Sequence, residues 1–284
     1  MHIPVLKEEV IKFLNVKRNE NFVDCTAGGG GHSRAILEKN GPEGEVLAME
    51  WDKLLFSRLK GEERLIAVNR SYVMLEETVK EKKFGPVSGV LFDLGFSSFH
   101  IEESGRGFSF MRDEPLDMRY NEDTLLTAKE IVNTYEEERI AEILTKWGEE
   151  EYAKKIAKKI VSRREDHPIK RTTQLVKIIE DSVPNIKRKI HCATKSFQAL
   201  RIAVNGEILN LREGLRQSLE VLRVGGVIVV ISFHGVEDKE VTKFFKNNEE
   251  NLEIITQRAI TPADKEIGFN IRSRSAKLRA AIKK

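Results

Sequence analysis

Short apolar runs separated by helical periods fill the first hundred residues. The runs 22–23, 46–49, 65–68 and 87–92 are apolar, and amphipathic segments lie between them. Strands buried on both faces show such runs, and the helices that alternate with them indicate crossover connections. The pattern therefore predicts an α/β fold with a parallel, doubly wound sheet.

A block of helical periodicity interrupts this pattern. Residues 127–183 repeat apolar positions at three- and four-residue steps, and Thr172 or Thr173 is placed to cap a helix over 174–182. A single long helix is expected next, because apolar positions recur at helical spacing from Phe197 onward.

The strand pattern resumes after the glycine pair 225–226, which is expected to end the long helix. An apolar, β-branched run at 227–231 has the character of a further buried strand. The sequence thus predicts an α/β domain formed by residues 1–105 and 207–284. An all-helical domain, 106–206, is inserted between its two parts.

A glycine-rich turn follows the first strand. The spacing Asp24-x-Thr26-x-Gly28-x-Gly30 is followed by Gly31, His32 and a helical segment, and glycine backbone at a helix N-terminus suits a nucleotide-type ligand. A dinucleotide fingerprint requires a third glycine, where this chain has Ser33 or Arg34. The spacing looks like the first motif of class I S-adenosylmethionine-dependent methyltransferases, although a structural turn is an alternative.

Acidic residues follow two further strands. Glu50 and Asp52 come at the end of the second strand, where a carboxylate can accept hydrogen bonds from ribose hydroxyls, and Glu50 is the preferred candidate. Tyr72 follows the third strand and is expected to pack on adenine or in the core. Asp93 ends the fourth strand and begins a turn, which makes it the second candidate for chemistry.

Composition narrows the class of protein. The chain has 284 residues, 33% of them charged, and two cysteines that form no Cys-x-x-Cys pair. We expect no disulfide framework, no zinc site and no metal requirement. No apolar run is long enough to span a membrane and no signal peptide is visible, so a cytoplasmic protein without membrane association is expected. The oligomeric state is left open, a homodimer included.

The net charge of +3 conceals two basic blocks. Residues 154–171 and 258–284 each contain eight Lys or Arg against two acidic residues. Solvated helix faces explain such blocks as well as a phosphate-backbone partner does, and both interpretations stay open.

Eight motifs together resemble one family over nearly the whole chain, the RsmH/MraW family of 16S rRNA cytosine-1402 N4-methyltransferases. The motifs are, in order, His2-Ile-Pro-Val-Leu6, Asp24-Cys-Thr-Ala-Gly-Gly-Gly-Gly-His32, Asp93-Leu-Gly-Phe-Ser-Ser98, Arg106-Gly-Phe-Ser-Phe110, Pro115-Leu-Asp-Met-Arg119, Phe197-Gln-Ala-Leu-Arg-Ile-Ala-Val-Asn205, Ile231-Ser-Phe-His234 with Glu237-Asp238, and Arg272-Ser-Arg-Ser-Ala-Lys-Leu-Arg279. The resemblance implies a class I methyltransferase domain interrupted by a helical RNA-recognition domain.

The resemblance also implies cofactor contacts for S-adenosylmethionine. They fall on the glycine turn and on strand ends, at Gly30, Gly31, His32, Glu50, Tyr72, Asp93 and His100. We add Asp24 and Gly28 from the glycine motif. The chain departs from the family pattern where Glu50 replaces aspartate, His100 replaces glutamine and Gly235 replaces serine. The segment 245–261 is also shorter than in many members.

The expected reaction is methylation of the exocyclic amine of a cytosine in 16S rRNA of the small ribosomal subunit. Asp93 is positioned to accept a hydrogen bond from this amine, with a role limited to the cofactor as the alternative. By analogy with DNA amino-methyltransferases, Phe96 is expected to stack on the flipped base. His234 is the other candidate proton acceptor, against a structural role.

Expected RNA phosphate contacts come from basic residues at the end of the chain and on the long helix, namely Arg201, Arg272, Arg274, Lys277 and Arg279. Three other hypotheses compete with the leading one. They are the same chemistry on another RNA or on DNA, an NAD-dependent oxidoreductase, and a non-catalytic RNA-binding protein.

Overall fold

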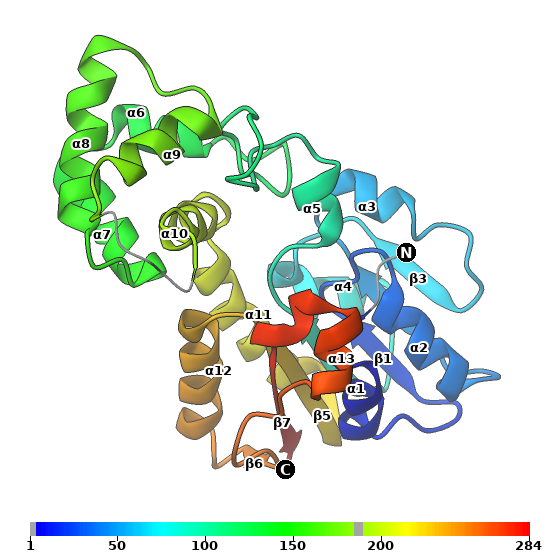
Figure 1. Ribbon diagram of the computed structural model, residues 1–284. Coiled ribbons are helices and arrows are strands. Elements are labelled where there is room, and N and C mark those ends of the chain that lie inside the picture. The colour runs from blue at the N-terminus through cyan, green and yellow to red at the C-terminus, as the bar shows by residue number, and fades with distance from the viewer. Residues whose placement is uncertain (1–3, 185–189) are drawn as a thin grey trace. The chain divides into compact units, whose positions relative to one another are not determined.

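The chain folds into two compact units in a computed structural model that describes residues 4–184 and 190–284. The first, here called the sheet unit, is formed by Met1–Gly95 and Ile208–Lys284, and the second, the helical unit, by Phe96–Glu207 (Figure 1). The helical unit begins before the insertion expected at 106–206, because Phe96 and His100 pack on aromatic rings of that unit. The expected functional division of the chain stays a prediction.

The sheet unit is built on seven strands in the order β3-β2-β1-β4-β5-β7-β6. The first five strands run parallel, and β7 is antiparallel to both β5 and β6. This order confirms the predicted α/β fold with a class I methyltransferase sheet. The strands are β1 (Asn21–Asp24), β2 (Val46–Met49), β3 (Leu65–Val68), β4 (Val87–Asp93), β5 (Leu222–Ser232), β6 (Leu252–Ile254) and β7 (Lys277–Lys283).

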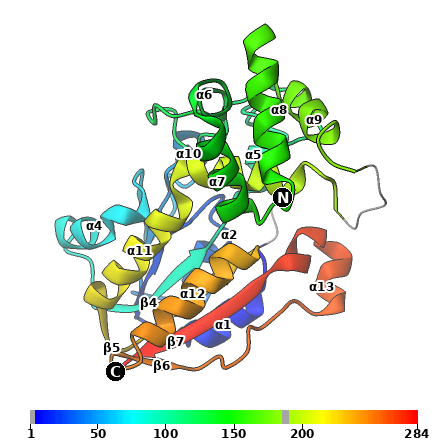
Figure 2. The ribbon, with the colours of Figure 1, turned by 90° about the vertical axis from the view of Figure 1, so that its left-hand side faces the viewer.

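Two apolar cores cover the two faces of this sheet. Along β4, Val90 and Phe92 belong to one core and Leu91 to the other, because successive side chains of a strand point to opposite faces. Helix α11 (Glu207–Val221) contributes to the first core, as does α12 (Gly235–Asn247) (Figure 2). The other helices of the unit are α1 (Lys7–Leu14), α2 (Gly31–Asn40), α3 (Lys53–Ser57), η1 (Tyr72–Met74), α4 (Leu75–Glu81), α13 (Asp264–Phe269) and η2 (Ile271–Ser275).

The helical unit has a single core of its own. Buried apolar side chains of α6, α7, α8, α9 and α10 form it, together with residues of the segment before α6. The described helices of this unit are α5 (Ser98–Glu102), α6 (Ala128–Thr134), α7 (Glu137–Gly148), α8 (Ala153–Asp166), α9 (Thr172–Glu180) and α10 (Thr194–Asn205).

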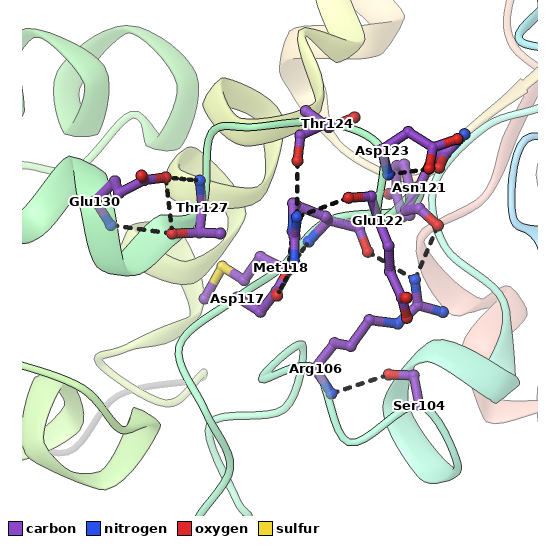
Figure 3. A network of polar contacts seen from close by, with 12 residues as sticks. Ser104, Arg106, Asp117, Met118, Asn121, Glu122, Asp123, Thr124, Thr127 and Glu130 are labelled. Atoms are coloured by element: carbon purple, nitrogen blue, oxygen red, sulfur yellow. Dashed lines mark hydrogen bonds and ion pairs between the residues drawn. The ribbon is translucent and has the colours of Figure 1, made fainter.

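Two arginines hold the irregular segment between α5 and α6, and Figure 3 shows Arg106 among residues of this segment. The guanidinium of Arg106 donates to the carbonyls of Arg119 and Tyr120, at 3.0 and 2.9 Å. That of Arg119 pairs with Asp117 at 2.7 Å and donates to two further backbone carbonyls. These bonds supply partners for backbone that no helix or sheet would otherwise satisfy. The segment ends at the capping box of Thr127, which starts α6.

Three predictions of local structure were wrong. The long helix is two helices, because Gly206 lies between α10 and α11 in the left-handed region, at φ 61°. The glycines at 225–226 lie within β5 and do not end a helix. The N-cap of α9 is Arg171, since α9 already begins at Thr172, whose hydroxyl bonds to the backbone of Arg112 instead.

Candidate functional site

Asp24, at the end of β1, stabilises the glycine turn from within the protein. It is 1% exposed, and its two oxygens accept hydrogen bonds from the Ser33 hydroxyl at 2.7 Å and the Thr26 amide at 3.1 Å. Burial raises the pKa of Asp24, against the effect of these two bonds. Ser33, which stands in place of a dinucleotide-type glycine, therefore connects α2 to the end of β1.

The glycines of the turn serve different purposes. Gly28 and Gly30 have φ of 53° and 82°, which favour glycine, and a Cβ at Gly31 would lie 2.8 Å from Pro4. Gly29 has no atom within 4 Å of the position of a Cβ. The turn is therefore conformationally fixed, and it leaves open space beside Gly29, whose carbonyl accepts a hydrogen bond from Arg34.

Glu50 connects the end of β2 to this turn. Its two carboxylate oxygens accept hydrogen bonds from the amides of Gly28 and Asp52, each at 2.7 Å. Burial raises the pKa of Glu50 to about 7, although both amide bonds favour the ionised form. Asp52 is instead the N-cap of α3 and accepts from the amides of Leu54 and Leu55. The structure thus places Glu50, the preferred candidate, at the turn.

Asp93 and His32 form a pair beside the turn. Their closest charged atoms, His32 Nε2 and Asp93 Oδ2, are 3.5 Å apart, and His32 is only 5% exposed. Burial lowers the pKa of His32, but the carboxylates of Asp93 and Asp24 together outweigh it, so the net shift is upward. The Thr26 hydroxyl accepts from the Asp93 amide at 2.6 Å, and the Leu94 amide donates to Ile231 at 2.9 Å. The backbone of this strand end is therefore fixed.

Polar atoms of this pair fit a charged ligand. In the part of the chain that the structure describes, neither ring nitrogen of His32 nor Oδ1 of Asp93 has a hydrogen-bond partner. Buried polar atoms without partners are costly, and a ligand that supplies donors would satisfy them. The carboxylates of Asp24, Glu50 and Asp93 influence one another electrostatically, directly or through Asp24. Such an acidic environment favours a cationic group such as a sulfonium or an ammonium.

Tyr72 packs edge-on against Phe92 of β4. The ring centroids are 5.4 Å apart, and Gly214 of α11 leaves room for the tyrosine, since a Cβ there would lie 2.7 Å from its ring. This contact supports the core alternative for Tyr72. Its contact with adenine stays a prediction.

His234 is the N-cap of α12. Its Nδ1 accepts from the Glu237 amide at 3.3 Å, and its Nε2 lies 3.0 Å from the Glu237 carboxylate. The other carboxylate oxygen of Glu237 accepts from the Phe233 amide at 2.8 Å. Because Nδ1 accepts a hydrogen bond, the neutral ring carries its proton on Nε2. The geometry supports the structural alternative for His234, and its role as a proton acceptor stays a prediction.

The predicted site residues of the helical unit form a group of their own. Arg201 is 6% exposed and makes two bonds to the Glu207 carboxylate, at 2.8 and 2.9 Å, while its guanidinium lies 4.5 Å from the ring centroid of Phe96. The ring of His100 contacts those of Phe108 and Tyr120. These contacts give Arg201 partners inside its own unit. Its contact with RNA phosphate stays a prediction.

The basic residues near the end of the chain fall into two groups. Lys277 and Arg279 on β7 both pair with Asp238, at 3.1 and 2.6 Å. Although burial opposes it, this pairing lowers the pKa of Asp238. Arg272 and Arg274 lie on η2 and are exposed. The RNA contacts expected of all four residues stay predictions.

Sequence reasoning missed the residues that support the site. Ser33 bonds to Asp24, and Thr26 bonds to the backbone of Asp93. Glu237 contacts His234, and Asp238 pairs with Lys277 and Arg279. Glu237 and Asp238 stood in a recognised motif, but nothing in the sequence indicated their partners.

The strand order and the acids at the ends of β1, β2 and β4 around a glycine turn define a class I methyltransferase. Comparison with a family model identifies the chain more closely, because residues 1–284 match the MraW methylase family. The chain belongs to this family. The assignment confirms the predicted class, an enzyme that uses S-adenosylmethionine, and disfavours the oxidoreductase hypothesis.

Relatives of known name match the chain over nearly its full length. "Ribosomal RNA small subunit methyltransferase H" of Dictyoglomus thermophilum is 45% identical over 285 residues, covering 98% of this chain and 95% of the relative. The protein of the same name from Thermosipho melanesiensis is 44% identical, with 99% and 97% covered. Among solved structures, an rRNA methylase from Streptococcus thermophilus matches with 12% identity, a TM-score of 0.46 and coverage of 100% and 99%.

None of the helices in residues 4–184 and 190–284 combines the length and the hydrophobicity that crossing a membrane requires.

Proposed function

We propose that this protein transfers a methyl group from S-adenosylmethionine to N4 of cytosine 1402 in the 16S rRNA of the small ribosomal subunit. Curated relatives that are 44–45% identical carry the name of a small-subunit rRNA methyltransferase. The single observation that carries the proposal is Asp93, held at the end of β4 with one carboxylate oxygen that lacks a partner among the described residues.

Cofactor binding falls to the glycine turn and the acids around it. Gly28 to Gly31 and Glu50 would hold the nucleoside part, and the acidic surroundings of Asp24 and Asp93 favour its positive charges. When bound, S-adenosylmethionine supplies a strongly electrophilic methyl group. His32 lies beside the Asp93 carboxylate, with its Nε2 3.5 Å from Asp93 Oδ2.

Asp93 has the role of hydrogen-bond acceptor for the cytosine amine. The lone pair of this amine is delocalised into the ring, so an acceptor that favours the pyramidal amine raises its reactivity. The Asp93 backbone is fixed by the Thr26 hydroxyl, which limits the freedom of its side chain. Holding the carboxylate in one place is how the protein provides orientation.

Phe96 is proposed to stack on the base. Its ring already contacts the guanidinium of Arg201 and lies 6.1 Å, centroid to centroid, from the stacked ring of Phe108. Aromatic stacking is worth about 1–3 kcal/mol per base. A role for Arg201 in holding the Phe96 ring follows from the same contact.

Methylation assays test the substrate. Purified small subunits from cells that lack the modification, naked 16S rRNA and DNA are each incubated with the enzyme and S-adenosylmethionine. The methylated nucleotide is then mapped by mass spectrometry. We expect N4-methylcytosine at position 1402 of the subunit or its rRNA. Methylation of DNA or of another RNA alone would overturn the proposed substrate, and RNA binding without any transfer would overturn the enzyme.

A cytoplasmic location and the absence of a metal requirement stay predictions, and the oligomeric state, a homodimer included, stays open. Mass measurement of the native protein tests the homodimer, and assays with a chelator test the metal.

A further inference from the structure

Helix α8 presents a cationic face to solvent. Lys154, Lys155 and Lys158 are exposed and Lys159 is half-exposed. At about 100° per residue, these four lysines lie in one sector of the helix, opposite the buried Ile156 and Ile160. They are here called the α8 lysines. Helix α8 packs on α6, α7 and α9 (Figure 2). The exposure of the α8 lysines shows that these neighbours leave this sector uncovered.

The α8 lysines differ from the other cations of the helix in their partners. Arg163 lies 4.0 Å from Asp181, and Arg164 donates to two backbone carbonyls. Within residues 4–184 and 190–284, the α8 lysines form no ion pair within 4.0 Å, and Lys155 only lies over the ring of Tyr152 at 5.8 Å. Lys159 interacts electrostatically with Asp181 beyond that distance. Four cations on one face without a close ion pair are electrostatically unfavourable in the absence of counterions.

Acidic residues limit the extent of this face. Glu165 and Asp166 follow at the C-terminal end of α8, and Glu137, Glu138 and Glu142 of α7 line a surface hollow with Lys154. Acidic charge therefore borders the α8 lysines on two sides, beside Lys154 and at the C-terminal end of the helix.

Helical spacing arranges the α8 lysines in two rows. Lys154 and Lys158 form one row and Lys155 and Lys159 the other, each with a step of about 6 Å along the helix. This step is comparable with the separation of successive phosphates along a nucleic-acid strand. Lysine ammonium groups bind phosphate as point charges and release its counterions.

A membrane surface does not fit the same face. Helices that lie on membranes insert a hydrophobic side, but the apolar side of α8 is buried in the core, with Ile156 at 0% and Ile160 at 1% exposure.

We propose that the α8 lysines bind the phosphate backbone of the RNA substrate. The inference rests on the proposed function and assigns a second contact region besides the predicted arginines. It concerns affinity for the substrate, since α8 carries none of the residues assigned to the reaction.

The test replaces all four α8 lysines by glutamine, which keeps helix propensity and removes four charges. The matched control replaces Lys17, Lys39, Lys243 and Lys246 by glutamine. These lysines are exposed residues of the sheet unit, also without an ion pair among the described residues. Binding to unmodified small subunits is measured across a salt series, together with kcat and KM and with the melting shift caused by S-adenosylmethionine.

We expect the α8 variant to lose at least about tenfold in affinity at low salt. The plot of log affinity against log salt should become shallower. The magnitude of its negative slope should decrease by about 3, because four phosphate contacts are lost at about 0.7 each. KM for subunits should rise, while kcat and the cofactor-induced melting shift stay as in the wild type. The control variant should keep most of the affinity and the slope.

Three outcomes would overturn the inference. They are wild-type affinity and slope in the α8 variant, equal losses in both variants, and α8-dependent binding to vesicles containing phosphatidylserine with unchanged RNA affinity. In each case wild-type protein that methylates subunits leaves the proposed function intact. Wild-type protein that transfers no methyl group to any RNA contradicts the proposed function itself.

Discussion

Two opposing influences act on the carboxyl group of Glu50. It accepts hydrogen bonds from two backbone amides, as an ionised acid would, yet burial raises its pKa to about 7. A bound cationic ligand stabilises the ionised form and lowers such a pKa. The proposed contact of Glu50 with the cofactor therefore predicts that cofactor binding depends on pH near neutrality.

Replacement of Glu50 by glutamine is expected to change how stability depends on pH. The pKa is about 7 in the folded protein and 4.5 as the ordinary value. Between these values the folded protein holds a proton that the unfolded chain releases, so the contribution of Glu50 to stability falls as pH rises from about 4.5 to 7. In thermal melts without cofactor, the Tm of the Glu50→Gln variant should therefore rise relative to the Tm of the wild type between pH 5 and pH 8. A constant difference between the two proteins would contradict the shifted pKa.

Replacement of Asp93 by alanine separates chemistry from RNA binding. Without the acceptor, methyl transfer should fall at least about tenfold, which corresponds to about 1.4 kcal/mol of barrier. Affinity for the small subunit should stay unchanged. Single-turnover rates and filter binding measure the two quantities, and unchanged turnover would refute the role of Asp93.

At the residue scale, the sequence identified the acids but not what holds them. Glu50 and Asp93 could be predicted because they follow strands whose ends meet at one edge of a parallel sheet. Ser33 was visible only as a missing glycine, and its bond to Asp24 depends on how α2 packs on β1. Likewise, nothing local to His234 showed that both of its ring nitrogens face Glu237.

Among the structural elements, the glycine turn and strand β4 allow a matched pair of variants. A Cβ added at Gly29 would have no atom within 4 Å. A Cβ added at Gly89 would lie 2.8 Å from Leu14 and 2.9 Å from Phe22. Gly89→Ala should cost about 1–3 kcal/mol of folding stability by overpacking. Gly29→Ala should change stability by no more than about 0.5 kcal/mol and yet reduce the melting shift caused by S-adenosylmethionine. A full cofactor shift in Gly29→Ala would mean that the ligand does not approach this backbone.

Element types were predicted well, and their ends less well. The strands β1 to β4 were recognisable as apolar runs because both of their faces are buried. Helices α10 and α11 share one continuous apolar period, so the hydrophobic pattern gave no sign of the break at Gly206. A glycine inside a helical pattern is compatible with a helix, and only the backbone conformation shows that this one ends it.

Across the whole molecule, the apolar cores of the two units are separate, with two in the sheet unit and one in the helical unit. A loss of stability in one unit can therefore be measured separately from the other. Ile156 is fully buried in the core of the helical unit. Ile156→Ala should destabilise that unit by about 2–5 kcal/mol. Hydrogen exchange monitored by mass spectrometry should show the protection of α7 and α8 falling first. An equal loss across β1 to β4 would indicate that the two units unfold as one.

The helical unit is inserted between two parts of the sheet unit, and this insertion affects the chain entropy of folding. Gly95 and Ile208 are both parts of the folded sheet unit, so the roughly one hundred residues between them form a closed loop. When this loop is folded, its ends are already confined, but when it is melted, joining them costs about 4 kcal/mol of chain entropy. This loss of chain entropy then reduces the net free energy gained by pairing β4 with β5. A mutation that melts the helical unit would thereby weaken the sheet through loop entropy alone, without altering a single contact in it.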